Sequence, residues 1–156
     1  MRSELFIDGG CRPTNPGPSG FAAVLRLPDG SERLVSRYIG WSTNNVAEYH
    51  GLVVGIKLAI AHIEFARGLD IYTDSKLLVG HLAQGWRVKS MRLKVLQREA
   101  IDLLTNHYSD SETGEWRWSI NWIPRNQNSQ ADQLCTAAIL QHRQQHPNPF
   151  SIKAGI

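Results

Sequence analysis

The chain has 156 residues and a formal net charge of +3, and 42% of its residues are hydrophobic and 20% charged. This composition is typical of a globular protein with one core and argues against wholesale disorder. Its two cysteines, Cys11 and Cys135, lie far apart without metal-ligand spacing, which argues against a disulfide framework and a zinc site. Because no apolar run reaches membrane-spanning length, we expect a cytoplasmic, monomeric protein without a membrane partner.

The order of the predicted elements indicates an α/β domain. Strands are predicted from short runs of β-forming residues and helices from longer runs with helical apolar periodicity. In chain order, we expect strands over 4–8, 20–27 and 33–39, a helix over 44–63, a strand over 69–73, helices over 75–84 and 91–107, a strand over 116–123 and a helix over 129–145. Hairpin connections make the first three strands antiparallel, whereas a strand, helix and strand in succession imply a parallel pair. The sequence therefore predicts a βββαβααβα order and a five-stranded mixed sheet flanked by helices.

Glycines and polar residues mark the expected ends of the helices. Gly68 is expected to stop the helix over 44–63, and Gly85 the helix over 75–84. Residues 1–146 are expected to form a single domain. Residues 147–156 carry no periodic pattern and are expected to form a C-terminal tail.

Glu48 falls on the inward side of the predicted helix over 44–63. At 100° per residue, Leu52, Gly55 and Ala59 lie within about 40° of it, so Glu48 shares their core-facing side. For a lone glutamate near the first turn, a capping role is the alternative. Because a buried anion is costly unless something pairs with it, Glu48 predicts a partner at this place.

Three further carboxylates are expected near Glu48. Asp8 ends the first strand, Asp74 ends the fourth, and Asp132 lies in the first turn of the last helix, three residues after Ser129. Since the carboxyl ends of parallel strands meet at one edge of a sheet, all four acids can face one cleft. Taken singly, Asp8 suits a turn, Asp74 a helix cap and Asp132 a capping box begun by Ser129.

Together, the four acids predict a site for a hard divalent cation. Like charges at one point repel unless a cation binds between them. Carboxylates without cysteine or histidine partners favour Mg²⁺ or Mn²⁺ over zinc. Two such ions, about 3.5–4 Å apart, can activate a water and stabilise the leaving oxygen of a phosphodiester. The residues therefore predict metal-assisted phosphodiester hydrolysis.

The chain resembles the ribonuclease H type 1 family, whose members cut the RNA strand of RNA/DNA hybrids. The resemblance spans about 6–140 and rests on five motifs in order, Phe6-Ile7-Asp8-Gly9-Gly10, Asn15-Pro16-Gly17, Ser42-Thr43-Asn44-Asn45-Val46-Ala47-Glu48, Tyr72-Thr73-Asp74-Ser75 and Ala131-Asp132. It implies the ribonuclease H-like fold, with Asp8, Glu48, Asp74 and Asp132 as catalytic ligands of two metal ions. It also implies attack of water on the scissile phosphate, which leaves 5′-phosphate and 3′-hydroxyl ends.

The sequence departs from the family pattern at two places. Many members carry a histidine in the loop before the last helix, but the loop 124–130 has none. Arg125 in this loop is expected to handle phosphate or product in its place, with a solvated loop arginine as the alternative. Many bacterial members also insert a basic helical handle, whereas the connector 85–91 is short, so we expect a variant without the handle.

Several polar residues resemble substrate contacts of the family. Asn15, Asn44 and Asn45 match positions that contact the hybrid near its 2′-hydroxyls, and Thr43 matches one that contacts a DNA-strand phosphate. Loop and cap chemistry is the alternative for all four. Trp86 is followed by five cations, which predict a track for a nucleic-acid backbone: Arg87, Lys89, Arg92, Lys94 and Arg98. The alternative for this segment is a solvated helix face with Trp86 as a core anchor.

Other residues are expected to be structural. Trp116, Trp118 and Trp122 alternate along the last strand, which predicts a packed sheet face. Histidines are expected at the surface, and Gly51 and Gly55 are expected to allow close packing of helix on sheet.

The predicted function is therefore a metal-dependent endoribonuclease that acts on RNA/DNA hybrids with Mg²⁺ or Mn²⁺. One alternative keeps the fold and changes the substrate to double-stranded RNA. Another is a nucleic-acid-binding module without catalysis. Loss of a ligand carboxylate would mark the binding module, and all four acids are present.

Overall fold

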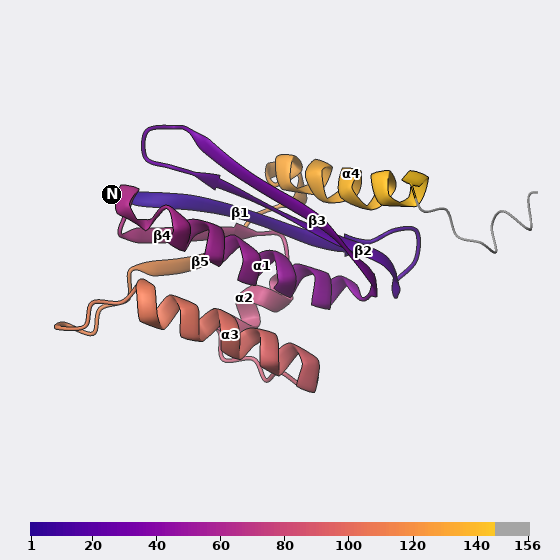
Figure 1. Ribbon diagram of the computed structural model, residues 1–156. Coiled ribbons are helices and arrows are strands. Elements are labelled where there is room, and N and C mark those ends of the chain that lie inside the picture. The colour runs from indigo at the N-terminus through magenta and orange to yellow at the C-terminus, as the bar shows by residue number, and fades with distance from the viewer. Residues whose placement is uncertain (146–156) are drawn as a thin grey trace, which may run out of the picture.

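The computed structural model of the chain describes residues 1–145 and, in the last helix, side chains as far as His142 (Figure 1). The expected tail over 147–156 and the expected domain boundary at 146 lie outside the described residues. The elements are β1 (Arg2–Cys11), β2 (Gly17–Arg26), β3 (Glu32–Ser42), α1 (Asn44–Ala61), the 3₁₀ turn η1 (Ile63–Phe65), β4 (Gly68–Thr73), α2 (Lys76–Ala83), α3 (Met91–His107), β5 (Trp118–Trp122), the 3₁₀ turn η2 (Arg125–Gln127) and α4 (Ser129–Gln145). The predicted βββαβααβα order is confirmed.

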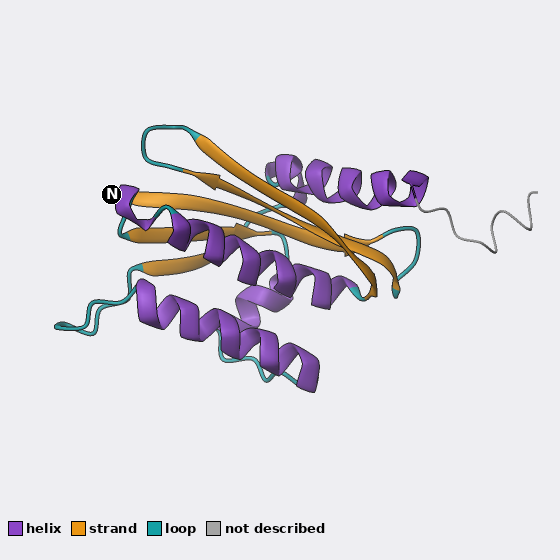
Figure 2. Cartoon of the chain, in the orientation of Figure 1, coloured by secondary structure: helices purple, strands orange, loops and turns teal. Residues whose placement is uncertain are grey.

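The five strands form one mixed sheet in the order β3-β2-β1-β4-β5. β2 pairs antiparallel with β1 and β3, and β4 pairs parallel with β1 and β5. Ala22 packs against Cys135 and Ile139 of α4, whereas Ala23 belongs to the main core beneath α1. Because successive strand residues point to opposite faces, α1 and α4 cover opposite faces of the sheet (Figure 2).

The strands extend further than the predicted runs. β1 continues through two glycines to Cys11, because Gly9 pairs with Phe21 and Gly10 with Gly20 on β2. The expectation that Gly68 stops the first helix is wrong. That helix is capped at His62, the η1 turn follows, and Gly68 begins β4.

Glycines in α1 allow the helix to lie directly on β1. A Cβ atom on Gly51 would lie 2.9 Å from the carbonyl oxygen of Asp8, and one on Gly55 would lie 3.1 Å from Ile7 Cγ2. The expected close packing is therefore confirmed. It fixes the start of α1 against the strand that carries Asp8.

Two expectations about aromatic residues are corrected. The exposed fractions of Trp116 and Trp122 are 64% and 45%, so the strand does not present a fully packed aromatic face. Trp116 lies before β5 and stacks on Trp118 with ring centroids 5.0 Å apart. His81 is buried rather than at the surface, and its Nδ1 atom lies 2.7 Å from the hydroxyl oxygen of Tyr49.

Among the described helices, none is long and apolar enough to cross a membrane.

Candidate active site

Three acidic side chains converge at the edge of the sheet where the parallel strands β1 and β4 end. Asp8 lies near the end of β1, Asp74 directly follows β4, and Glu48 lies in the second turn of α1. Each offers a carboxylate oxygen, and these oxygens lie within 4.8 Å of one another. The described structure therefore brings Asp8, Glu48 and Asp74 together, as expected.

Gly9 brings Glu48 to this edge. A Cβ atom at Gly9 would lie 2.4 Å from the backbone nitrogen of Glu48 and 2.4 Å from the carbonyl carbon of Ala47. Only a residue without a side chain lets the two backbones approach this closely. The first turns of α1 therefore contact β1 one residue beyond Asp8.

Asp132 lies beside this group rather than in it. Its Oδ1 atom is 3.5 Å from Arg12 Nη2 and 3.3 Å from Arg125 Nη2, so two guanidinium groups share one carboxylate. Asn128, buried at the start of α4, donates its Nδ2 hydrogen to the carbonyl oxygen of Ile7 at 2.8 Å. This bond ties the start of α4 to β1 next to Asp8. The alternative of a capping box is not seen, because the hydroxyl of Ser129 donates to Asn126.

The electrostatics of the three converging acids favour a bound cation. Burial raises the pKa of Asp8 to about 8, with further contributions from the charges of Asp74 and Asp132. Burial also raises the pKa of Glu48 to about 7, although a hydrogen bond with Ser75 opposes the shift. The pKa of Asp74 is raised, again chiefly by burial. A divalent cation between these oxygens would offset the repulsion, so the donor set fits Mg²⁺ or Mn²⁺.

A pocket of about 380 Å³ surrounds the three acids. Cations from three separate parts of the chain also line it, namely Arg12, Lys76 and Arg125. The pocket thus combines carboxylate oxygens that could hold a metal ion with cationic groups that can contact a phosphate. Such a combination suits a phosphodiester, whose charge needs neutralisation on more than one side.

Arg12 and Trp122 line the pocket although neither was predicted as a site residue. Arg12 lies in the Pro- and Gly-rich segment after β1, where no periodic pattern indicates direction. Trp122 is the last residue of β5 and pairs with Thr73 of β4. It donates its Nε1 hydrogen to the carbonyl oxygen of Asp74 at 3.2 Å. Lys76 Nζ lies over its ring, 5.3 Å from the centroid. The indication in the sequence was that Trp122 lies near the end of its predicted strand, as Thr73 does just before Asp74.

The predicted substrate residues form a connected set at the start of α1. Asn44 lines the pocket, and its Oδ1 atom accepts from the backbone nitrogen of Cys11 at 2.9 Å. Asn15 accepts from the backbone nitrogen of Asn44 at 3.0 Å, and Thr43 caps the helix. Asn45 is exposed beside them. These contacts are the expected loop and cap chemistry, and substrate binding by the same residues remains a prediction.

Trp86 lies away from the pocket. Its exposed fraction is 48%, and a Cβ atom at Gly80 would lie 2.1 Å from its ring, so it covers α2 instead of anchoring the core. The five cations that follow Trp86 in sequence, at 87, 89, 92, 94 and 98, are all exposed. Arg98 pairs with Asp102 at 3.5 Å. Residues 84–90 connect α2 to α3 without a further helix.

Comparisons with known proteins agree with this arrangement. A family model described as "Reverse transcriptase-like" matches residues 6–138. The chain is 36% identical over 141 residues to the bifunctional protein Rv2228c of Mycobacterium tuberculosis, a match that covers 89% of this chain and 36% of that protein. The chain thus spans about a third of the length of this curated relative.

Two solved structures are similar over nearly their whole length. RNase H1 from the halophilic archaeon Halobacterium salinarum is 30% identical with a TM-score of 0.76, covering 90% of this chain and 99% of that chain. LC11-RNase H1, solved in complex with an RNA/DNA hybrid, is 28% identical with a TM-score of 0.77, covering 90% of this chain and 98% of that one. By its family model, its sequence and its fold, the chain belongs to the ribonuclease H type 1 family.

Proposed function

We propose that the chain is a metal-dependent endoribonuclease that hydrolyses the RNA strand of RNA/DNA hybrids. The convergence of Asp8, Glu48 and Asp74, with carboxylate oxygens within 4.8 Å, carries the proposal. The hybrid bound to LC11-RNase H1 supports the substrate class. The proposed enzyme is a cytoplasmic monomer with one catalytic domain over 1–146, and light scattering tests the monomer.

Asp8, Glu48, Asp74 and Asp132 are the proposed holders of two Mg²⁺ ions, for which Mn²⁺ can substitute. When bound, such ions supply activation of the attacking water and stabilisation of charge on the phosphate. The raised pKa values of Asp8 and Glu48 mean that these ligands exchange protons for a cation. The proposed products carry 5′-phosphate and 3′-hydroxyl ends.

The cationic residues of the pocket are proposed to hold the substrate and release the product. Lys76 and Arg12 line the pocket, where they can neutralise a phosphate that flanks the cleaved bond. The side chain of Arg125 is 68% exposed, so its guanidinium can leave Asp132 and follow a product phosphate. This role is the one that the histidine of other members is expected to serve.

The remaining contacts are proposed to recognise the hybrid. Asn15, Asn44 and Asn45 offer amide groups at the start of α1, where short polar side chains suit contacts with 2′-hydroxyls. Thr43 is the proposed contact of a DNA-strand phosphate, and the half-exposed ring of Trp86 is a proposed contact farther along that strand.

Cleavage of a labelled RNA/DNA hybrid tests the proposal. With Mg²⁺, the wild-type protein should cut the RNA strand and leave fragments that a ligase accepts at their 5′-phosphate. The variant Asp74→Asn should lose about 10²-fold or more of this activity, because a metal ligand contributes several kcal/mol to the transition state. Asp102→Asn, the same change on an exposed residue of α3, is the matched control.

Near-wild-type cleavage by Asp74→Asn would overturn the assignment of the site. The same assay on double-stranded RNA at the same salt concentration separates the two substrate classes. Cutting of duplex RNA in preference to the hybrid would contradict the proposed substrate.

A further inference from the structure

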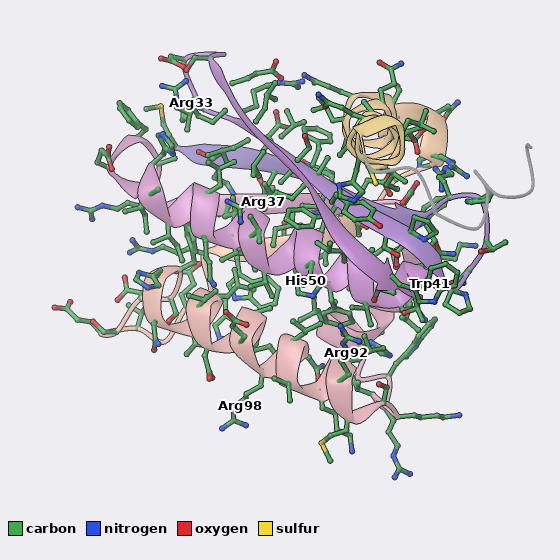
Figure 3. All side chains as sticks on the ribbon, turned by 45° about the vertical axis from the view of Figure 1, so that its right-hand side comes forward. Arg33, Arg37, Trp41, His50, Arg92 and Arg98 are labelled. Carbon is green, nitrogen blue, oxygen red and sulfur yellow. The ribbon has the colours of Figure 1, made fainter. Side chains whose placement is uncertain are left out.

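A cationic strip crosses the face of the molecule that α1 covers. Arg37 of β3, His50 of α1 and Arg92 of α3 follow one another across this face (Figure 3). Trp41, near the end of β3, lies to one side of this line. We call these four residues the cationic strip. They come from three different elements, and none of them was predicted to act together with the others.

Contacts between the elements show that members of the strip are neighbours. Phe21 is the pairing partner of Arg37 on β2, and its ring stacks on the ring of His50 with centroids 6.4 Å apart. Arg37 and His50 therefore lie on the same side of the sheet. Burial and then the nearby charge of Arg92 lower the pKa of His50, against an opposing effect of Glu99. Burial and the charge of Arg92 therefore favour the neutral form of the His50 imidazole.

The two arginines of the strip are available to a partner. Arg37 and Arg92 are exposed, and within the described part of the chain neither forms an ion pair. By contrast, the nearby Lys57 is paired with Glu99 at 2.9 Å. Trp41 is 68% exposed, a large apolar ring open to solvent. Unpaired arginines beside an exposed aromatic ring are typical of surfaces that bind a nucleic-acid backbone.

The strip adjoins the candidate active site at the start of α1. Trp41 precedes the helix cap Thr43 by two residues, and the next residue, Asn44, lines the pocket. Trp41 is therefore the member of the strip nearest in sequence to the pocket. Arg37 and Arg92 lie on either side of the helix beyond that point (Figure 3).

We propose that the cationic strip binds the sugar-phosphate backbone of the substrate outside the segment held in the pocket. The inference rests on the proposed function and adds to it a longer footprint along the hybrid. Arg37 and Arg92 contact phosphates, and Trp41 packs its ring against a sugar or a terminal base. Because these contacts read charge and not base identity, the strip increases affinity without selecting a sequence.

Charge reversal in the strip tests the inference. The double variant Arg37→Glu/Arg92→Glu is compared with wild type on two hybrids, one just long enough to fill the pocket and reach Thr43, the other longer by about one helical turn of ten base pairs. Binding is measured by fluorescence anisotropy in EDTA, and cleavage in Mg²⁺ gives KM and kcat. Arg67→Glu, an exposed arginine immediately before β4, is the matched control.

The double variant should bind the longer hybrid about tenfold more weakly, with kcat and binding of the short hybrid unchanged. Loss of two phosphate contacts should also reduce the slope of log Kd against log salt by about 2. Trp41→Ala should weaken binding of the longer hybrid, and Trp41→Phe should restore it.

Equal affinity of wild type and double variant for the longer hybrid, or the same loss with Arg67→Glu, would overturn the inference. These outcomes are distinct from failure of the proposed function. If wild type cleaves hybrid but the strip variants behave like wild type, only the inference fails. If wild type binds neither hybrid, both fail.

Discussion

At the scale of single residues, Arg12 and Arg125 differ in how firmly each holds Asp132. Arg12 donates to the carbonyl oxygen of Cys11 at 3.0 Å and to the hydroxyl of Thr136 at 3.5 Å, besides its contact with Asp132. The Arg125 side chain is 68% exposed, compared with 32% for Arg12. Arg12 is therefore the fixed partner that orients Asp132, and Arg125 is the freer one.

Replacement of Arg12 should therefore slow turnover more than it weakens substrate binding. We expect Arg12→Ala to lower kcat about tenfold with a smaller change in KM, because it removes the ion pair of Arg12 with Asp132. Arg12→Lys should recover part of kcat because it keeps the charge but not the fork geometry. Steady-state kinetics on the hybrid measure both, with Arg33→Ala on β3 as the control. An Arg12→Ala variant with unchanged kcat would show that Asp132 does not need this partner.

Some residues of the site could be predicted from the sequence and others could not. Asp8, Glu48 and Asp74 could be predicted because strand ends and helical periodicity place them at one edge. Asp132 was also expected near them, from its place in the first turn of the last helix, and it interacts with Asp8. Its contacts with Arg12 and Arg125 could not be predicted, since they depend on side chains from separate loops. Trp122 was expected on a packed face from its alternation, but β5 ends there, so its ring lies at the pocket instead.

At the scale of elements, the contact between α1 and β1 sets the distance between Glu48 and Asp8. Gly9 lies against the backbone of Ala47 and Glu48 at this contact. Any side chain at Gly9 must move the helix away from the strand. The same contact therefore determines both packing and the geometry of the acids.

We expect Gly9→Ala to destabilise the protein by about 1–3 kcal/mol and to reduce metal-dependent cleavage in the molecules that fold. Gly10→Ala is the matched control, because a Cβ atom there meets only side chains, at 3.1 Å from Arg12 Nη1 and 3.6 Å from Asn44 Oδ1. Urea unfolding followed by circular dichroism gives the two free energies. Equal stability of the two variants would contradict the proposed role of the contact.

The element order and strand directions could be predicted from periodicity and connection length, but several boundaries could not. β1 was expected to end at Asp8, yet pairing with β2 carries it through Gly9 and Gly10. Gly68 was expected to stop a helix, yet its pairing partner Arg2 places it in a strand. Both errors arise because pairing with a distant strand outweighs the local preference of glycine.

At the scale of the whole molecule, the candidate site opposes the stability of the fold at neutral and alkaline pH. The folded-state pKa values of Asp8 and Glu48 are about 8 and about 7, compared with reference values of 3.8 and 4.5. The folded protein therefore binds more protons than the unfolded chain between these values. The contribution of these two acids to the free energy of unfolding is complete below about pH 4 and is lost as the pH rises toward 8.

This linkage predicts that Asp8→Asn raises the melting temperature in EDTA at pH 8 and has less effect at pH 6.5. Each kcal/mol gained in the free energy of unfolding corresponds to a rise of about 2–4 °C in melting temperature for a protein of this size. The pKa values of His50 and His81 are lowered in the folded protein, so these histidines reduce stability as the pH falls. Their effect begins only below the reference pKa of 6.5. Between pH 6.5 and 8, the change in stability therefore comes from the acids. Differential scanning calorimetry measures the difference, and a variant less stable than wild type at pH 8 would contradict it.

Metal addition should reverse the same loss of stability. In wild type, Mg²⁺ should raise the melting temperature more at pH 8 than at pH 6.5, because ion binding releases the protons held by Asp8 and Glu48. Asp8→Asn should reduce this gain, since one ligand is removed. A gain independent of pH would indicate that the ion binds elsewhere.

Metal binding at the candidate site can be observed in a crystal of the protein soaked in Mn²⁺ and measured at the manganese absorption edge. We expect an anomalous peak among the carboxylate oxygens of Asp8, Glu48 and Asp74, which lie within 4.8 Å of one another. We also expect a second peak on the side of Asp132. Intact carboxylates without an anomalous peak between them, at a Mn²⁺ concentration that supports cleavage, would show that these acids do not hold the catalytic metal.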